Sequence, residues 1–187
     1  MNRVHVIRHG RPAATWGGED ADPGLDEAGR AQAEAVAREI LALPDRPTRV
    51  VASPLRRCRE TAEPLAAALG VAVQIDPRVG EIPTPAALSA AERPDWLRQA
   101  FAGRWDQMAG DLDYVDWTRG VGAALREHGG AAVFSHFVAL NAAVCVATGQ
   151  AEVMAFRPDH CSRTVFEIDG DRLILVEKGR EAQSQVL

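Results

Sequence analysis

Hydrophobic and polar positions follow two different periods along the chain, and the change from one to the other predicts a series of strands and helices. Short runs rich in Val and Ile, bounded by Gly, Pro, Asp or Ser, predict strands. The predicted strands are residues 3–8, 49–52, 71–75, 131–134, 163–168 and 172–178. The last two flank Asp169-Gly170-Asp171, which predicts a terminal hairpin with a tight turn.

Helices are predicted where apolar residues recur three or four positions apart. These stretches are about residues 26–42, 53–69, 114–128 and 138–148. Asp26 is a predicted N-cap, and Ser53-Pro54 is interpreted as an N-cap followed by proline at the first helical position. Pro64 is expected to bend the second helix. The stretch 138–148 is apolar on nearly every side, which predicts a buried helix.

The interval between the third strand and residue 114 is the least regular part of the chain. It contains Glu81, several prolines and then Trp96, Phe101 and Trp105, a pattern that predicts one or two short helices. We interpret about residues 82–113 as a cap inserted into a single domain that spans residues 1–187. The two tryptophans are interpreted as packing residues of this cap.

The order of these elements predicts the architecture. Strands that alternate with helices indicate an α/β fold, here a three-layer sandwich with a mostly parallel central sheet, helices on both faces, a small cap insertion and a C-terminal hairpin. In such sheets ligands bind at the carboxyl ends of the strands. His9 and His136 each follow the carboxyl end of a predicted strand, so we expect both at the same rim.

Composition narrows the function classes. Twenty-one basic against 26 acidic residues give a formal net charge of −5, which argues against a nucleic-acid-binding surface. Lys178 is the only lysine, so a single arginine is weak support for a site. The three cysteines, Cys58, Cys145 and Cys161, have no disulfide or zinc spacing. No apolar stretch reaches the length of a signal peptide or a membrane span, so we expect a cytoplasmic protein without membrane association.

The stretch Arg8-His9-Gly10 carries the first candidate chemistry. A neutral imidazole can attack phosphorus or a carbonyl carbon, and an adjacent guanidinium can hold an anion through paired hydrogen bonds. Gly10 allows a sharp turn or a close approach of the backbone to a ligand. The tripeptide alone also fits an Arg and a His that face water at the end of a strand.

Four motifs taken in order resemble the histidine phosphatase superfamily, which is also called phosphoglycerate-mutase-like. A further segment, Asp22–Gly29, is similar to the one that follows the first motif in many members. The four motifs are Arg8-His9-Gly10, Ser53-Pro54-Leu55-Arg56-Arg57-Cys58-Arg59-Glu60-Thr61, Glu81 and Ser135-His136.

The resemblance implies a role for each of five residues. His9 would be the nucleophile that becomes phosphorylated, and Arg8, Arg57 and His136 would hold the phosphoryl group. Arg57 is selected because the family's arginine follows the motif's serine by four residues. Glu81 would be the proton donor, although Glu19 and Asp20 in the first loop compete for that role.

The chain departs from the family pattern at three places. Phe137 stands where members often have Gly, and Thr15 stands where many have Asn, so both are candidate substrate-contacting residues. Residues 82–85 replace a segment that often holds Gly and an aromatic residue. The other histidines receive other interpretations: His5 as structural, His128 as a helix-end cation, and His160 as a surface-loop residue within reach of the rim.

These observations predict a metal-independent phosphomonoester hydrolase that acts through a phosphohistidine at His9. Guanidiniums would neutralise the charge of the phosphoryl group, so we expect neither a metal nor another cofactor. The expected partner is a small phosphorylated metabolite or a phosphoprotein, and the chain is expected to be a monomer or a homodimer. A phosphoglycerate-type mutase and a non-catalytic phosphate-ligand binding module are the alternatives.

Overall fold

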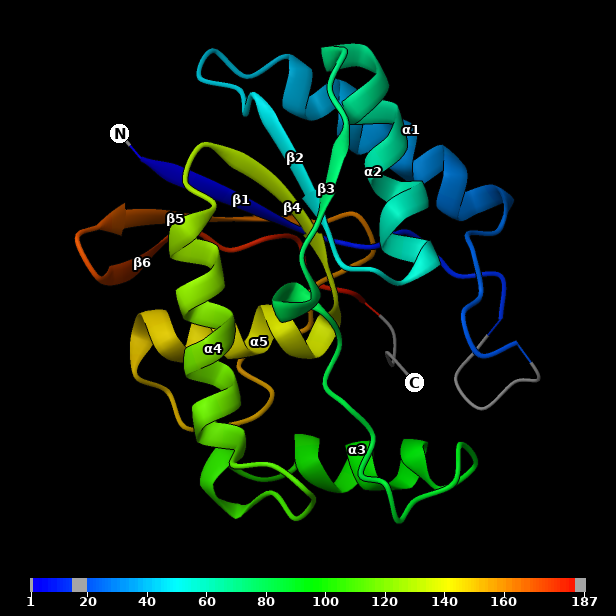
Figure 1. Cartoon of the computed structure of the whole chain (residues 1–187), viewed down its shortest axis with the longest axis vertical. Coiled ribbons are helices and arrows are strands. Elements are labelled where there is room, and N and C mark those ends of the chain that lie inside the picture. The colour runs from blue at the N-terminus through cyan, green and yellow to red at the C-terminus, as the bar shows by residue number, and fades with distance from the viewer. Residues whose placement is uncertain (1, 15–19, 184–187) are drawn as a thin grey trace.

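The computed structural model describes residues 2–14 and 20–183. Within these residues a six-stranded sheet runs through the centre of the molecule in the order β3-β2-β4-β1-β5-β6 (Figure 1). Its strands are β1 (Arg3–Arg8), β2 (Arg49–Ala52), β3 (Val73–Ile75), β4 (Ala131–Ser135), β5 (Arg163–Asp169) and β6 (Arg172–Glu177).

Five of these six strands run in the same direction, and β5 alone runs in the opposite one. β4 pairs with β1 on one side and with β2 on the other, and β2 pairs in turn with β3, all in parallel. β5 is antiparallel to both β1 and β6. The predicted α/β class, the mostly parallel sheet and the C-terminal hairpin are confirmed.

Helices cover both faces of the sheet because side chains along each buried strand alternate between the faces. Ile7, Ala52 and Phe134 pack in one hydrophobic cluster with α1 (Glu27–Leu41) and α2 (Arg56–Leu69). Val6, Val51 and Val133 point the other way, into a second cluster with α4 and α5. These helices, α4 (Tyr114–Glu127) and α5 (Phe137–Thr148), lie opposite α1 and α2 in Figure 1.

Two local predictions were wrong. Ser53 is not the N-cap of α2, because the helix begins at Arg56 and Leu55 occupies the cap without a side-chain bond. The Ser53 hydroxyl is used in the site described below. β3 begins at Val73 rather than Val71, because the N–H of Val71 closes the end of α2 by donating to Ala66 at 3.1 Å.

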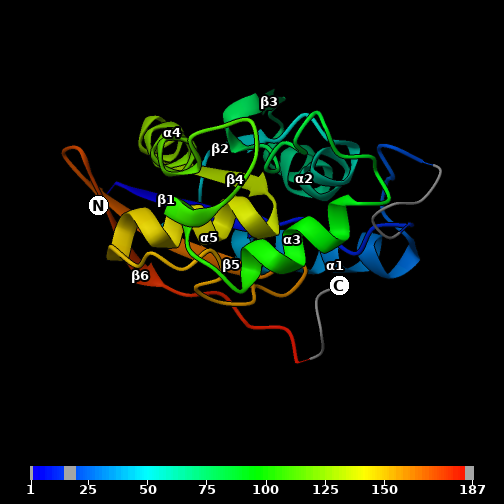
Figure 2. The ribbon, with the colours of Figure 1, turned by 90° about the horizontal axis from the view of Figure 1, so that it is seen from below.

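The interval interpreted as a cap holds two short helices. After the single turn η1 (Pro77–Val79), the chain leaves the sheet and forms α3 (Arg93–Phe101) and η2 (Trp105–Gln107). Figures 1 and 2 show α3 outside the sheet, next to α4 and α5, which with α1 and α2 are the four main helices. Trp105 is buried and Trp96 packs against the same core as α4 and α5, so both tryptophans are packing residues as expected.

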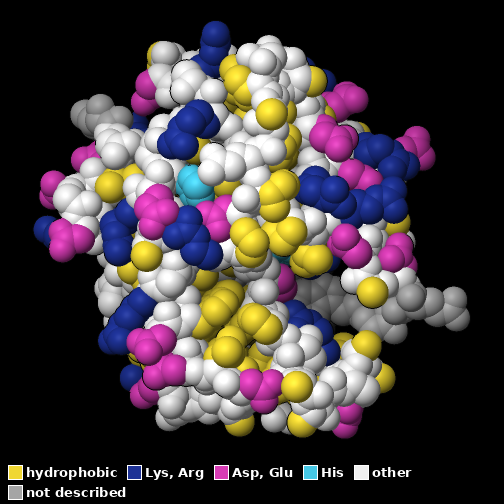
Figure 3. Space-filling view, in the orientation of Figure 1, with side chains coloured by type: hydrophobic (Ala, Val, Ile, Leu, Met, Phe, Trp, Pro, Cys, Tyr) yellow, Lys and Arg dark blue, Asp and Glu magenta, His cyan; other side chains and the backbone are white. Residues whose placement is uncertain are grey.

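The surface carries both signs of charge. Figure 3 shows acidic and basic side chains mixed on both flanks of one face, with hydrophobic side chains in the centre, over β3 and the segment that leads to the cap. In residues 2–14 and 20–183 no helix has the length and apolar character that a membrane span requires.

Candidate active site

Parallel pairing brings the two histidines of the rim together. In the β1–β4 pair Arg8 lies opposite Ser135, so the next residues, His9 and His136, leave the sheet side by side. The N–H of His9 donates to the Ser135 carbonyl at 3.0 Å, and the two imidazole centroids are 5.3 Å apart. The rim predicted from strand order therefore exists, and both histidines lie in it.

The tautomer of His9 is set by the carbonyl group of the next residue. Its Nδ1 lies 2.8 Å from the Gly10 carbonyl, and because a carbonyl can only accept, Nδ1 carries the proton and Nε2 keeps the lone pair. The ring is buried, and this burial, together with His136 and Arg8, lowers the pKa of His9 well below its usual value. His9 is thus a neutral imidazole with a nucleophilic Nε2.

Gly10 holds the turn that follows this histidine. Its N–H donates to the Thr61 hydroxyl at 2.9 Å, and a Cβ at this position would meet the Gly29 carbonyl oxygen at 2.7 Å. Only glycine allows α1 and the end of β1 to approach so closely.

Arg8 is buried beside His9 and is held by three neighbours. Its Nη1 donates to the Pro158 carbonyl at 2.8 Å, and its guanidinium carbon lies 5.2 Å from the centre of the Phe137 ring. Its carbonyl accepts from Cys161 at 3.0 Å. The Nε of Arg8 is buried without a hydrogen-bond partner among the described residues, which leaves a donor for an anion.

Arg57 and His136 form a second arm of the site. Nη2 of Arg57 donates to Nδ1 of His136 at 3.1 Å, so the proton of this imidazole is on Nε2, which donates to the Ser53 hydroxyl at 2.8 Å. Burial and the two nearby guanidiniums, those of Arg57 and Arg8, lower the pKa of His136 well below its usual value. Arg57 Nε is buried and lacks a partner in the part of the chain that the structure describes.

The N-terminus of α5 adds backbone donors at the same rim. His136 is the N-cap residue of this 12-residue helix and makes no side-chain cap bond. The first N–H groups of a helix have no intrahelical acceptor and favour an anion. A phosphoryl group beside His9 would therefore meet backbone as well as guanidinium donors.

Glu81 lies in the segment between η1 and the cap, near Arg57 and Arg93. Oε1 accepts from the Ile82 N–H at 2.9 Å, while Oε2 is buried with no partner in residues 2–14 and 20–183. The segment is fixed to the sheet because the Ser135 hydroxyl donates to the Val79 carbonyl at 2.7 Å. Burial raises the pKa of Glu81, and nearby Arg93 and Arg57 offset part of this effect.

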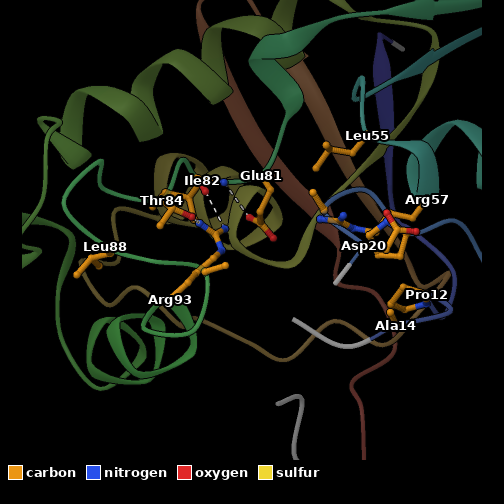
Figure 4. Close-up of a pocket in the computed structure, with 13 residues that line it drawn as sticks. Pro12, Ala14, Asp20, Leu55, Arg57, Glu81, Ile82, Thr84, Leu88 and Arg93 are labelled. Atoms are coloured by element: carbon orange, nitrogen blue, oxygen red, sulfur yellow. Dashed lines mark hydrogen bonds between the residues drawn. The ribbon is translucent and has the colours of Figure 1, made fainter. Parts of the chain in front are cut away.

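A cavity of about 460 Å³ opens in front of Glu81 and Arg57. Figure 4 shows the Glu81 side chain between Arg93, which comes from α3, and Arg57, which comes from α2. Arg93 donates to the Ile82 carbonyl at 2.9 Å and also to the Thr84 hydroxyl. Most of the remaining lining is apolar, and it comprises Pro12, Ala14, Ala21, Pro23, Leu55, Ile82, Leu88 and Ala90.

The structure brings most of the predicted site residues together. His9, Arg8, Arg57, His136 and Glu81 converge at the carboxyl ends of β1, β2 and β4. Of the competing carboxylates, Asp20 is exposed at the edge of the cavity. Thr15 and Glu19 lie outside the described residues.

Phe137, a candidate substrate-contacting residue, lies at the N-terminus of α5. It is buried between the Arg8 guanidinium and Phe101, whose ring centroid is 5.3 Å from its own. It is not among the residues that line the cavity. Its ring contacts Arg8 on one side and Phe101 of the cap on the other.

Three residues have contacts at the site that the sequence interpretation did not predict. Arg93 looks like any arginine of a surface helix, and no local pattern marks its approach to Glu81. Ser53 is placed as a capping residue by its position before Pro54, yet it holds His136. His160, interpreted as a surface-loop residue, has its ring centroid 5.8 Å from that of His9.

Within residues 2–14 and 20–183 no three His, Cys, Asp or Glu side chains form a group that could hold a metal ion.

Comparisons with known proteins identify a family for the chain. Residues 4–180 match the profile of the histidine phosphatase superfamily (branch 1). A 79-residue stretch is 46% identical to the uncharacterized protein Rv0525 of Mycobacterium tuberculosis, and a 91-residue stretch is 33% identical to the transcription factor tau 55 kDa subunit of Saccharomyces cerevisiae. The matches cover 40% and 43% of this chain, but only 38% and 21% of those proteins.

Two solved structures extend the likeness to the whole chain. The mycobacterial glucosyl-3-phosphoglycerate phosphatase has a TM-score of 0.74 at 21% identity, over 97% of this chain and 100% of its own. The phosphoserine phosphatase of Entamoeba histolytica has a TM-score of 0.76 at 19% identity, over 98% of both chains. At such identities the likeness establishes the fold. Because the family profile spans nearly the whole chain and the fold agrees with it, the chain belongs to the histidine phosphatase superfamily, branch 1.

Proposed function

We propose that this protein hydrolyses small phosphomonoesters through a phosphohistidine formed on Nε2 of His9, without a metal ion. The observation that carries the proposal is the environment of His9. Its Nδ1 is tied to the Gly10 carbonyl, and Nε2 is left free beside two buried guanidiniums, each with an unpartnered Nε in the part of the chain described. This arrangement suits a group that attacks phosphorus while fixed cations hold the phosphoryl oxygens.

The first step transfers the phosphoryl group to the protein. The lone pair on Nε2 of His9 forms a bond to phosphorus as the bond from phosphorus to the ester oxygen breaks. Arg8, Arg57 and the N–H groups of α5 stabilise the charge on the phosphoryl oxygens. Protonated Glu81 gives its proton to the departing oxygen, which leaves as an alcohol.

The second step returns the protein to its starting state. Ionised Glu81 takes a proton from a water molecule, whose oxygen attacks phosphorus opposite His9. The bond between Nε2 and phosphorus breaks, and inorganic phosphate departs. His9 is again neutral, and Glu81 has regained its proton.

The size of the cavity supports a small substrate. A volume of about 460 Å³ falls within the range of small-molecule sites. Its lining is mostly apolar around the Glu81, Arg57 and Arg93 side chains, so the alcohol part of the substrate would meet apolar walls and the Arg93 cation. Two of the structurally similar proteins are named for small phosphorylated substrates, which supports the same class here.

Trapping of the intermediate tests the proposal. Rapid acid-free quenching of the wild-type protein with ³²P-labelled phosphomonoester should give a phosphoenzyme that is stable to base and labile to acid. His9→Ala should give none and should lose turnover. His5→Gln, a change on the same strand but outside the site, should retain both. Absence of a phosphoenzyme in the wild-type protein, or its persistence in His9→Ala, would refute the assignment.

The role of the guanidiniums gives a second expectation. Because Arg8 and Arg57 neutralise the phosphoryl charge, hydrolysis of an aryl phosphate should continue in excess EDTA. The rate should be measured before and after dialysis against chelator. Loss of activity that magnesium restores would show that the arginines alone are insufficient.

A further inference from the structure

The turn at residues 158–162, between α5 and β5, is fixed to the residue that precedes His9. Pro158 accepts from the Arg8 side chain at 2.8 Å, and the Ser162 carbonyl accepts from the Arg8 N–H at 3.2 Å. Cys161, which has a left-handed φ of 53°, donates its N–H to the Arg8 carbonyl at 3.0 Å. These three bonds hold His160, within the turn, in a set position relative to His9.

The imidazole of His160 lies against that of His9. The two ring centroids are 5.8 Å apart with an interplanar angle of 52°, so His9 has one imidazole neighbour in His136 and another in His160. The side chain of His160 is half-buried, and its nitrogens make no hydrogen bond to any residue in 2–14 or 20–183. Burial and the nearby Arg8 lower the pKa of His160 to about 4, so near neutral pH the ring has one N–H and no charge.

His136 has no such freedom in this arrangement. Its Nδ1 accepts from Arg57 and its Nε2 donates to Ser53, so both nitrogens are already used by protein groups. The N–H of the neutral His136 ring is thus engaged by a protein group before any phosphoryl group binds. The ring N–H of His160, by contrast, has no partner among the described residues.

We propose that His160 donates its imidazole N–H to an oxygen of the phosphoryl group during transfer to and from His9. This inference rests on the proposed function. No proton leaves His160: the hydrogen bond strengthens as negative charge builds on the phosphoryl oxygens, and the ring stays neutral. His160 is then a catalytic residue that contacts the reacting group, in addition to Arg8 and Arg57.

Two kinds of variant separate a donor from a packing residue. His160→Phe keeps an aromatic ring against His9 but has no N–H. His160→Asn and His160→Gln lose the ring, but their amide nitrogens reach the places of Nδ1 and Nε2 respectively. If His160 donates a hydrogen bond, Phe should lower kcat/KM for an aryl phosphate about 10- to 100-fold. Inhibition by vanadate should weaken by a similar factor. Of the Asn and Gln variants, the more active one should recover most of the kcat/KM and most of the vanadate inhibition.

The opposite ranking of the Phe and amide variants would overturn the inference. If His160 only packs against His9, the Phe variant should match the wild-type protein and both amides should be impaired. Ser162→Ala is a matched control in the same turn, because the Ser162 hydroxyl is buried without a partner among the described residues. Ser162→Ala should leave kcat/KM and the inhibition constant for vanadate unchanged.

A measurement on the wild-type protein does not depend on the folding of any variant. In ¹⁵N-histidine-labelled protein, vanadate should shift the ring resonances of His160. These resonances are assigned by their loss in His160→Asn. A spectrum in which vanadate does not move them would contradict the contact. The two proposals fail differently. Wild-type protein that forms a phosphoenzyme on His9, with His160→Phe equally active, removes only the role of His160. Wild-type protein with neither turnover nor phosphoenzyme removes the proposed function itself.

Discussion

Glu81 experiences two opposing influences. Burial favours its neutral form, while the guanidiniums of Arg93 and Arg57 favour the carboxylate, and the net effect is a raised pKa. This balance suits a residue that must donate a proton in one step and accept one in the next. We therefore expect Glu81→Gln to impair hydrolysis of alkyl phosphates far more than that of nitrophenyl phosphate, whose nitrophenolate leaving group departs without a proton. The expected difference is about 10² to 10⁴ in kcat/KM.

The measurement is a pair of kcat/KM values for the two substrates in wild-type and variant protein. Asp20→Asn is the matched control, since this carboxylate is exposed at the edge of the cavity. Equal impairment of both substrates by Glu81→Gln, with a strong leaving-group dependence in Asp20→Asn, would transfer the role of proton donor to Asp20.

The raised pKa of Glu81 also predicts a pH dependence. The residue must be protonated to assist the leaving group, so this assistance is complete at low pH and is lost as pH rises through the raised value. The alkyl and nitrophenyl phosphates ionise at different pH values, so the ratio of their kcat/KM values is compared between two proteins that meet the same substrates. This ratio should fall more steeply with rising pH in the wild-type protein than in Glu81→Gln. The same pH dependence in both proteins would contradict the assignment.

Phe137 packs against the guanidinium of Arg8. The guanidinium lies over its ring, and a cation–π contact of this kind contributes about 1 kcal/mol. Phe137→Leu should therefore weaken vanadate inhibition about fivefold and affect all substrates alike. Phe101→Leu, which changes the other neighbour of this ring, should leave vanadate inhibition unchanged. A changed preference between substrates in Phe137→Leu would show that the side chain reaches the cavity after all.

At the residue scale, the sequence predicts the place of a site residue when its neighbours in the chain determine that place. Arg8, His9 and His136 each follow or end a predicted strand, so a rule about strand ends suffices to place them together. Arg93 and His160 reach the site through long-range packing of the cap and of the turn at 158–162. Nothing within a few residues of either one records that packing.

Among the elements, β3 and η1 are joined to α4 by a charge network that is buried at one end and exposed at the other. Asp76 accepts from the Arg78 side chain at 2.7 Å and pairs with Nε2 of His128 at 2.8 Å, while Arg78 also binds Glu127. His128 was expected to be a helix-end cation, but it is buried and engaged by Asp76. The network fixes the segment that ends in Glu81.

Asp76→Asn should destabilise the fold at neutral pH. Arg78 and His128 lower the pKa of Asp76, so its contribution is present above the unfolded value of about 3.9 and is lost as pH falls below it. We expect a loss of about 3 kcal/mol in the free energy of unfolding at pH 7, and a smaller difference between the two proteins at pH 3. Denaturant unfolding at the two pH values measures both.

Glu127→Gln is the control for this network, because Glu127 lies at its exposed end. An exposed pair contributes about 0 to 1 kcal/mol, so this variant should stay close to the wild-type protein. An Asp76→Asn protein as stable as Glu127→Gln at pH 7 would show that the buried carboxylate does not anchor β3.

Helix and strand positions were predicted well where a residue serves only the local structure. Asp26 caps α1, and its side chain accepts from the Gly29 N–H at 2.7 Å as the pattern requires. Ser53 shows the opposite case: its hydroxyl holds His136, so α2 starts later with an uncapped N-terminus. Local capping rules fail there because a contact with a distant strand takes the same oxygen.

For the whole molecule, periodicity predicts the class of fold but not the order of strands. Neither pattern nor composition shows that β4 lies between β1 and β2, an order set by how the helices pack on both faces. The same holds for the cap. Its composition indicates short helices, but only the fold shows that Leu97 and Trp105 join the core of α4 and α5.

This shared core predicts that the cap does not unfold by itself. Leu97 is fully buried and belongs to one hydrophobic cluster with Val6, Phe137 and Phe166, so the cap has no separate core. Leu97→Ala should lower the free energy of unfolding of the whole molecule by about 2 to 4 kcal/mol, with a single cooperative transition. Tryptophan fluorescence, to which Trp96 and Trp105 of the cap contribute, should change together with far-UV circular dichroism.

Leu112→Ala is the control for the same interval, because Leu112 is 41% exposed and should cost little. The comparison requires denaturant titrations followed by both probes in the wild-type protein and both variants. A fluorescence transition that precedes the loss of circular dichroism would mean that the cap opens independently. In that case the segment that carries Arg93 could leave Glu81 while the sheet and the four main helices stay folded.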